Sequence, residues 1–166
     1  MSIAFERGFK AWCERLALKK RLDLGAKPAD RLDPQALANN LNIRVWSIDE
    51  VPGLPPQPKQ ALLNDTDSSW SAVTICLNEK RLIVLNSSHS EGRLASDLAH
   101  ELSHLLLEHK PAPPKISSTG TMMLESYDQQ QEEQGNWLAG CLLLPRDALV
   151  HIKRKRIENA DAAKHY

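Results

Sequence analysis

The sequence predicts an α+β fold, in which a small, mostly antiparallel sheet of about three strands packs with several helices. Two observations support this class. Apolar residues recur with helical spacing in both the first and the last third of the chain, whereas short β-branched runs occupy the middle. One of the later helices carries two histidines one turn apart beside a leucine-rich stripe, so we expect that helix to pack on the sheet.

The chain has the length of one domain. Its 166 residues contain no internal repeat and no low-complexity tract, so we expect a single domain over residues 1–166. Within it we expect three consecutive parts: N-terminal helices at about 1–42, the sheet at about 43–86 and the site-bearing helices at about 91–160. The proline-rich stretch at 51–60 is interpreted as a surface connection, because too little chain precedes it for an independent core.

Local signals place the individual elements. A first helix is expected at about residues 3–22, and a second, short helix follows Asp33, an N-cap residue with Pro34 at the first helical position. Strands are expected at "IRVWSI", "SAVTICL" and "RLIVLN", and the last two form a hairpin through "NEK". The remaining expectations are a short helix over 59–63, helices over 91–109, 129–143 and 146–160, and a loop over 111–128.

Composition argues against several classes of protein. The 21 basic and 21 acidic residues give a formal net charge of +0, so nothing global attracts nucleic acid or an anionic membrane. Three widely spaced cysteines indicate reduced thiols, and no apolar run reaches the ~20 residues that span a bilayer. We therefore expect a cytoplasmic protein without direct nucleic-acid or membrane partners. The basic cluster at 151–156 is interpreted as a solvated helix face.

The stretch "HELSH" at residues 100–104 carries the clearest chemical signal. Because a helix turns by about 100° per residue, His100 and His104 project from one face and can reach a single metal ion. Glu101 lies beside them, in the position of the general base of H-E-x-x-H metallopeptidases. The alternative is a surface helix with ordinary polar residues.

A zinc site that keeps one position open for water needs a third protein ligand. The segment "QQQEEQGNWLAGCLLLP" offers Glu132, one turn before Asn136, on a helix that could pack against the first. Gly135 suggests a close helix approach, because glycine costs helix stability of about 1 kcal/mol. By themselves, however, Glu132 and Glu133 are better explained as a solvated acidic face.

Together, "SDLAHELSHLLLEH" and "EEQGNWLAGCLLLP" resemble the ImmA/IrrE family of metallopeptidases, whose second motif reads approximately E-x-x-A-N-x-F-A-x-x-L-L-x-P. The segments "GFKAWCERLALKKR", "LDPQALANNLNI" and "SSWSAVTI" extend the resemblance over nearly the whole chain. It implies a zincin-like, gluzincin-like fold with Glu132 as the third ligand, four residues before Asn136, and Glu133 as the fallback. Gly135 and Leu138 replace the usual alanine and phenylalanine of the second motif.

The resemblance also implies a function. The expected protein is a zinc-dependent endopeptidase, with manganese as an alternative metal, whose metal ligands are His100, His104 and Glu132 and whose catalytic base is Glu101. Its expected partner is a protein substrate, a helix-turn-helix transcriptional repressor cleaved in a regulatory or stress response. Two other functions stay open: a non-catalytic or weakly catalytic binding regulator on the same fold, and a general cytosolic peptidase.

The other polar residues have no pattern that assigns them a catalytic role. Asp97 and Asn136 are candidates to orient the ligand imidazoles. Residues that could donate a hydrogen bond to an oxyanion are each better explained by surface exposure or packing; they are His89, His109, Tyr127 and His151.

Overall fold

The computed structural model describes residues 5–64, 70–77, 80–110, 115–116, 122–123 and 128–158. Within these ranges it has six α-helices and a three-stranded sheet, which confirms the α+β class. The elements are α1 (Phe9–Asp23), α2 (Pro34–Asn40), β1 (Arg44–Ser47), η1 (Ile48–Glu50), α3 (Pro56–Leu63), β2 (Ala72–Leu77), β3 (Lys80–Leu85), α4 (Glu91–Leu106), β4 (Lys115–Ile116), β5 (Met122–Met123), α5 (Gln129–Leu143) and α6 (Arg146–Lys155).

Helix starts follow the local chemistry of the preceding residues. The first helix starts at Phe9 and not near residue 3, because Gly8 has a φ of 94°, a left-handed conformation that interrupts a helix. The second starts as predicted: the Asp33 side chain accepts a hydrogen bond of 2.9 Å from the Gln35 backbone N–H. The third starts at Pro56, three residues before the prediction, since proline suits the first helical turn.

Two helix ends come earlier than predicted, and both have a left-handed residue beyond them. α4 ends at Leu106, before Glu108 with a φ of 55°, and α6 ends at Lys155, before Arg156 with a φ of 53°. The predicted loop over 111–128 is also incorrect in part. It contains the two short antiparallel strands β4 and β5, while the residues around them lie outside the described chain.

The three-stranded sheet has the order β1-β3-β2 and is mixed. β2 and β3 form the predicted antiparallel hairpin, in which Thr74 pairs with Ile83, whereas β1 runs parallel to β3, with Val45 opposite Ile83. Since side chains alternate along a strand, Thr74, Ile83 and Val45 share one face. Ile83 is buried in the core with Leu98 of α4, so this face covers α4, and β2 is left as an edge strand.

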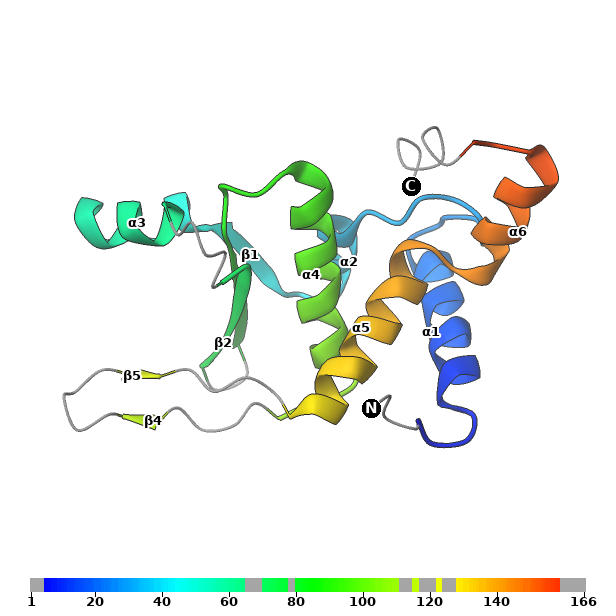
Figure 1. The fold of residues 1–166 in the computed structure, drawn as a ribbon, viewed down its shortest axis with the longest axis horizontal. Helices are drawn as coiled ribbons and strands as arrows, with labels where there is room; N and C mark the ends of the chain where they lie inside the picture. Colours follow the sequence, from blue (N-terminus) through cyan, green and yellow to red (C-terminus); the bar gives the residue numbers. More distant parts are fainter. Residues whose placement is uncertain are drawn as a thin grey trace.

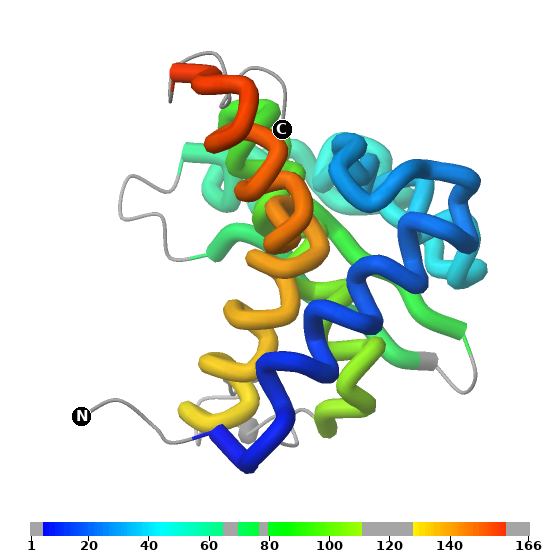
Figure 2. The backbone as a smooth tube through the Cα atoms, turned by 90° about the vertical axis from the view of Figure 1, so that its right-hand side faces the viewer, coloured from blue at the N-terminus to red at the C-terminus, as the bar shows by residue number. Residues whose placement is uncertain are grey.

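The helices form layers on this face of the sheet. In Figure 1, α4 lies between the sheet and α5, and α1 lies on the far side of α5; Figure 2 shows α1 and α5 crossing close together. None of the helices that the structure describes is long and apolar enough to cross a membrane. The buried core that joins the layers consists of Cys13, Ala17, Leu32, Leu37, Ala38, Ile43, Ile83, Leu98, Leu102, Leu138, Cys141 and Leu142.

A fully buried arginine joins α1 to the end of α5. Arg21 donates from Nη2 to the Leu142 carbonyl at 2.8 Å, from Nε to the Asp30 carbonyl at 3.2 Å and from Nη1 to the Ala17 carbonyl at 3.4 Å. The last carbonyls of an α-helix have no partner within the helix, so this side chain satisfies part of the C-terminus of α5. It thereby helps to fix the position of α5, the helix that carries Glu132.

Replacing this arginine should destabilise the fold. Arg21→Met is expected to lower the free energy of unfolding by about 2–4 kcal/mol, because it leaves buried carbonyl groups without donors. Lys19→Met, which removes an exposed charge two residues away on the same helix, should change it by no more than about 0.5 kcal/mol. Urea unfolding of both variants measures the difference, and equal effects would contradict the role assigned to Arg21.

Candidate metal centre

α4 presents His100 and His104 because of the way its apolar stripe is buried. Leu98, Ala99 and Leu102 are all buried, as the sequence predicts, and this fixes the rotation of the helix against the sheet. His104 is itself completely buried, whereas the His100 side chain is 23% exposed. The pair therefore lies at the edge of the core with one accessible member.

α5 brings an acidic residue to this pair. The Asp128 side chain caps the helix by accepting a hydrogen bond of 2.9 Å from the Gln131 backbone N–H, and Glu132 follows in the first turn. The helix packs against α4 along a buried face that includes Gly135 and Leu138. Of the two residues that depart from the usual motif, Gly135 faces His104 of α4 and Leu138 is buried in the core.

Three potential metal ligands converge between the two helices. Nε2 of His100 lies 2.9 Å from Nε2 of His104 and 3.3 Å from Oε2 of Glu132, and the three ligand atoms all lie within 4.8 Å of one another. Ligand atoms at ~2.0–2.1 Å from a tetrahedral zinc ion are ~3.3 Å apart, so the two distances from His100 are close to the spacing that zinc requires. Glu133, the fallback ligand, is not in this cluster of the described residues.

The backbone of α5 at Gly135 lies very close to the imidazole of His104. A Cβ atom added to Gly135 would lie 2.8 Å from Nε2 of His104 and 3.1 Å from its Cε1, closer than Cβ atoms normally approach. The glycine that replaces the usual alanine therefore has a physical reason in this chain. It lets the backbone of α5 pass directly over the nitrogen atom that would bind the metal.

His109, which we expected to be a surface or packing residue, contacts His104. The end of α4 is a Schellman motif, in which the backbone N–H of His109 bonds to the carbonyl of His104 at 3.0 Å and that of Glu108 to Leu105 at 3.2 Å. This turn returns the chain over the last helical turn. Nδ1 of His109 consequently lies 2.9 Å from Nδ1 of His104.

The hydrogen bonds define the tautomers of these imidazoles. Nε2 of His109 lies 3.0 Å from Oε1 of Gln134, an acceptor, so His109 carries its proton on Nε2 and accepts on Nδ1. His104 then donates from Nδ1, and its Nε2 lone pair is directed to the cluster. Burial, followed by the neighbouring His100 and His109, lowers the pKa of His104 to about 3, so the ring stays neutral as metal binding requires.

Glu101 is held by the edge strand. The Thr74 hydroxyl on β2 donates a hydrogen bond to Oε2 of Glu101, a contact that the sequence did not indicate. Burial is the largest influence on this carboxyl group and raises its pKa, while the hydrogen bond from Thr74 acts in the opposite direction. The result is a desolvated carboxyl group in which one oxygen atom is held by Thr74, and which follows directly after the candidate ligand His100 in the sequence.

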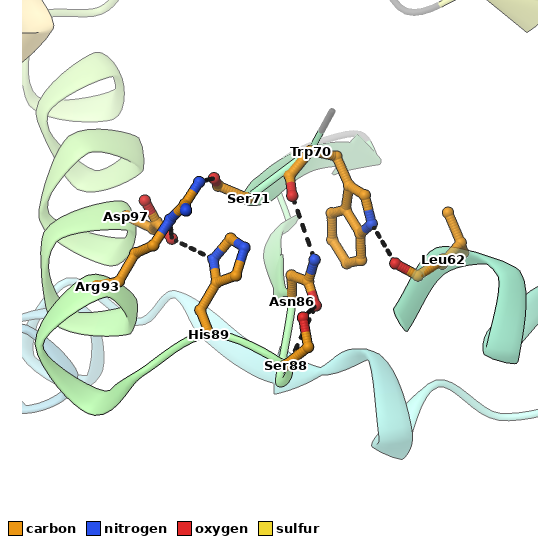
Figure 3. Close-up of polar contacts among 8 residues, drawn as sticks. All are labelled: Leu62, Trp70, Ser71, Asn86, Ser88, His89, Arg93 and Asp97. Atoms are coloured by element: carbon orange, nitrogen blue, oxygen red, sulfur yellow. Dashed lines mark hydrogen bonds and ion pairs between the residues drawn. The ribbon is translucent and has the colours of Figure 1, made fainter. Parts of the chain in front are cut away.

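Asp97 does not orient a ligand imidazole but belongs to a second polar network, shown in Figure 3. Its Oδ2 lies 3.0 Å from Nδ1 of His89 and 3.9 Å from Nε of Arg93, and Arg93 in turn donates to the Ser71 hydroxyl at 3.0 Å. This network ties the first turns of α4 to the start of β2. It therefore helps to hold Glu101 opposite Thr74.

The remaining candidates have no place in the cluster. Asn136 is exposed and makes no side-chain hydrogen bond with the described residues, so the proposal that it orients a ligand is not supported by the structure. His151 is exposed on α6, as expected for a surface residue, and Tyr127 lies outside the described residues.

Comparison with known proteins identifies the class that these features define. The model of the Peptidase M78 family, described as the IrrE N-terminal-like domain, matches residues 55–166, and the function of that family is of the metallopeptidase type. The chain is therefore a member of the ImmA/IrrE family. No curated protein and no solved structure gives a significant match.

Two glycines of α5 provide a matched test of the helix contact. Gly135→Ala should displace the His104 imidazole and weaken zinc binding by about tenfold or more, since a misplaced ligand shell reduces metal affinity. Gly140→Ala, which has nothing within 4 Å of the new methyl group, should leave zinc binding unchanged and stabilise the helix by up to about 1 kcal/mol. Zinc titration calorimetry and thermal unfolding measure both effects. Equal zinc affinities in the two variants would contradict the close contact.

Proposed function

We propose that the protein is a zinc-dependent endopeptidase in which His100, His104 and Glu132 hold the metal and Glu101 is the catalytic base. The observation that carries this proposal is the convergence of the three ligand atoms beside a desolvated carboxylate. Two imidazoles and one carboxylate form a donor set that suits zinc, with manganese as the alternative. The room provided by Gly135 and the neutral His104 fit the same assignment.

The chemistry divides between the ion and the protein. When bound, zinc would polarise the scissile carbonyl group and lower the pKa of the attacking water. Glu101 accepts the proton of that water and later delivers it to the leaving amine. The Thr74 hydroxyl holds Oε2 of Glu101, so Oε1 is the oxygen available to the water. Burial of the carboxyl group makes it a stronger base than an exposed glutamate.

The free edge of β2 is the proposed site for the substrate backbone. β2 is at the edge of the sheet, and its Thr74 touches Glu101, so an extended peptide paired with this strand would pass beside the cluster. Main-chain pairing positions a peptide without selecting its sequence. Selectivity must therefore come from contacts elsewhere on the protein.

The proposed substrate is an intracellular helix-turn-helix repressor, as the resemblance to the family implies. A binding regulator without catalysis is the second candidate, and the presence of a base and three ligands in one cluster argues against it, because binding alone requires none of them. A general peptidase is the third. It would need a site that accepts many sequences, whereas the cluster lies between two closely packed helices beside one sheet edge.

Separate variants should distinguish the base from the ligands. Glu101→Gln should lower peptide cleavage by about 10²–10⁴-fold and retain about one zinc ion per chain, because the base does not coordinate the metal. Glu132→Ala should lose both zinc and activity, and Glu133→Ala on the same helical turn should keep both. Elemental analysis after dialysis and a cleavage assay measure these outcomes. Loss of zinc in Glu133→Ala with retention in Glu132→Ala would reverse the ligand assignment.

The substrate proposal is tested with two proteins at equal concentration in the presence of zinc or manganese. The helix-turn-helix protein encoded beside this chain should be cut at a defined position, and unfolded casein should stay nearly intact, because a selective site needs recognition beyond main-chain pairing. Rapid digestion of casein with the repressor intact would support the general peptidase. Binding of the repressor without cleavage, equal in the parent and in Glu101→Gln, would support the binding regulator.

A further inference from the structure

The face of the sheet that points away from α4 contains a hollow of about 450 Å³. Arg44 of β1, Leu82 of β3 and Ile75 of β2 pair across the three strands and form one row on this face, opposite the row that contains Thr74. The residues that line the hollow are Asn42, Arg44, Trp46, Ile75, Lys80, Arg81 and Leu82. Trp46 and Lys80 are two positions from Arg44 and Leu82 on their strands, so they lie on this same face. Trp46, Ile75 and Leu82 therefore form an apolar floor that is bordered by the cations Arg44 and Lys80, while Arg81 lines the hollow from a position whose side chain alternates to the other face.

The charges around this hollow are unbalanced. Arg44, Lys80 and Arg81 are exposed, and their side chains make no hydrogen bond or ion pair with any residue that the structure describes. No described acidic residue lines the hollow. Because the whole chain has a formal net charge of +0, the local excess of positive charge from Arg44 and Lys80 is a feature of the surface and does not follow from the overall composition.

The floor is unusually apolar for an exposed surface. Ile75 is 47% exposed although it is in the middle of a strand, and Trp46 and Leu82 beside it are only partly covered. Large apolar side chains rimmed by polar ones are typical of surfaces that bind another protein. Burying this floor on a partner would remove apolar area from water and strengthen the attraction of the surrounding cations.

We propose that this hollow binds an acidic segment of a protein partner, with one or two apolar side chains of that segment on Trp46, Ile75 and Leu82. Its carboxylates pair with Arg44 and Lys80. The open, exposed rim does not enclose a ligand as small-molecule pockets do, and those bury most of the ligand surface. Nucleic acid fits less well, since it is bound through a basic groove with aromatic stacking, and here aliphatic residues make up most of the floor.

The hollow and the candidate metal centre share strand β2. Thr74 points to Glu101 on one face, and its neighbour Ile75 lines the hollow on the other. A peptide paired with the free edge of β2 would place alternate side chains on these two faces. In this view, which rests on the proposed function, the partner is the substrate itself and the hollow supplies the selectivity that main-chain pairing lacks.

Binding is measured by fluorescence anisotropy with the full-length Glu101→Gln protein, so that cleavage plays no part. The probes are a labelled acidic peptide, EEDLEFEDE, the matched peptide EEDSESEDE without its apolar residues, and a short oligothymidylate. The first peptide should bind most tightly, because it alone has both carboxylates and apolar anchors. Higher salt should weaken the binding.

Charge reversal at two places provides the control. Arg44→Glu combined with Lys80→Glu should weaken binding of EEDLEFEDE by about tenfold or more, since like charges in contact are repulsive. Lys153→Glu combined with Arg154→Glu makes the same charge change on exposed residues of α6 and should alter binding by no more than about twofold. Ile75→Ser should remove the preference for the peptide with apolar residues. Thermal unfolding checks that each variant is folded. If the first double variant does not fold, Lys80→Glu alone takes its place.

Several results would overturn the proposal. Equal losses in the two charge-reversed pairs would mean that the attraction is general, and tighter binding of the oligothymidylate would assign the hollow to nucleic acid. Failure of EEDLEFEDE to bind would also reject it. These outcomes are separate from catalysis. A variant at Arg44 and Lys80 that still cuts the repressor at the parental rate would refute the hollow alone, and an inactive parent that binds EEDLEFEDE would refute the endopeptidase alone.

Discussion

The close approach of α5 to α4 at Gly135 is the contact on which the candidate site depends. It places the backbone of one helix against the imidazole of the other, and only at this separation can Glu132 reach the two histidines. The core residues that join the helices and the buried Arg21 at the end of α5 maintain the same separation. The site that results has a buried, neutral imidazole at His104 beside the partly exposed His100 and Glu132, and burial of His104 strengthens its interaction with a bound cation.

Much of the fold could be predicted because its signals are local. A capped helix start, an alternating hairpin and a leucine stripe are each specified by a few neighbouring residues, and they placed α2, the β2–β3 hairpin and the start of α4 correctly. The spacing of His100 and His104 likewise fixes their relative position on one helix. Glu132 is different, since nothing in its own neighbourhood sets it apart from Glu133; only the resemblance selected it, and the structure places it in the cluster.

The features that could not be predicted depend on contacts between distant segments. The parallel pairing of β1 with β3 follows from the path of the chain and has no local signal. His109 reaches His104 only because Glu108 adopts a left-handed conformation, which is uncommon for a residue other than glycine. Thr74 is a single hydroxyl residue in an apolar strand, and its contact with Glu101 requires the register of the hairpin and the position of α4 together. These supporting residues complete the site around the recognisable motif.

The central claim is that one metal ion is held between α4 and α5 by residues of both helices. Crystals grown with zinc and measured on both sides of the zinc absorption edge test it directly. A zinc ion held in this way gives one strong anomalous peak within ~2.0–2.2 Å of Nε2 of His100, Nε2 of His104 and a carboxylate oxygen of Glu132. A zinc peak that is bound by the two histidines and Glu133, or one that lies away from α5, would contradict it.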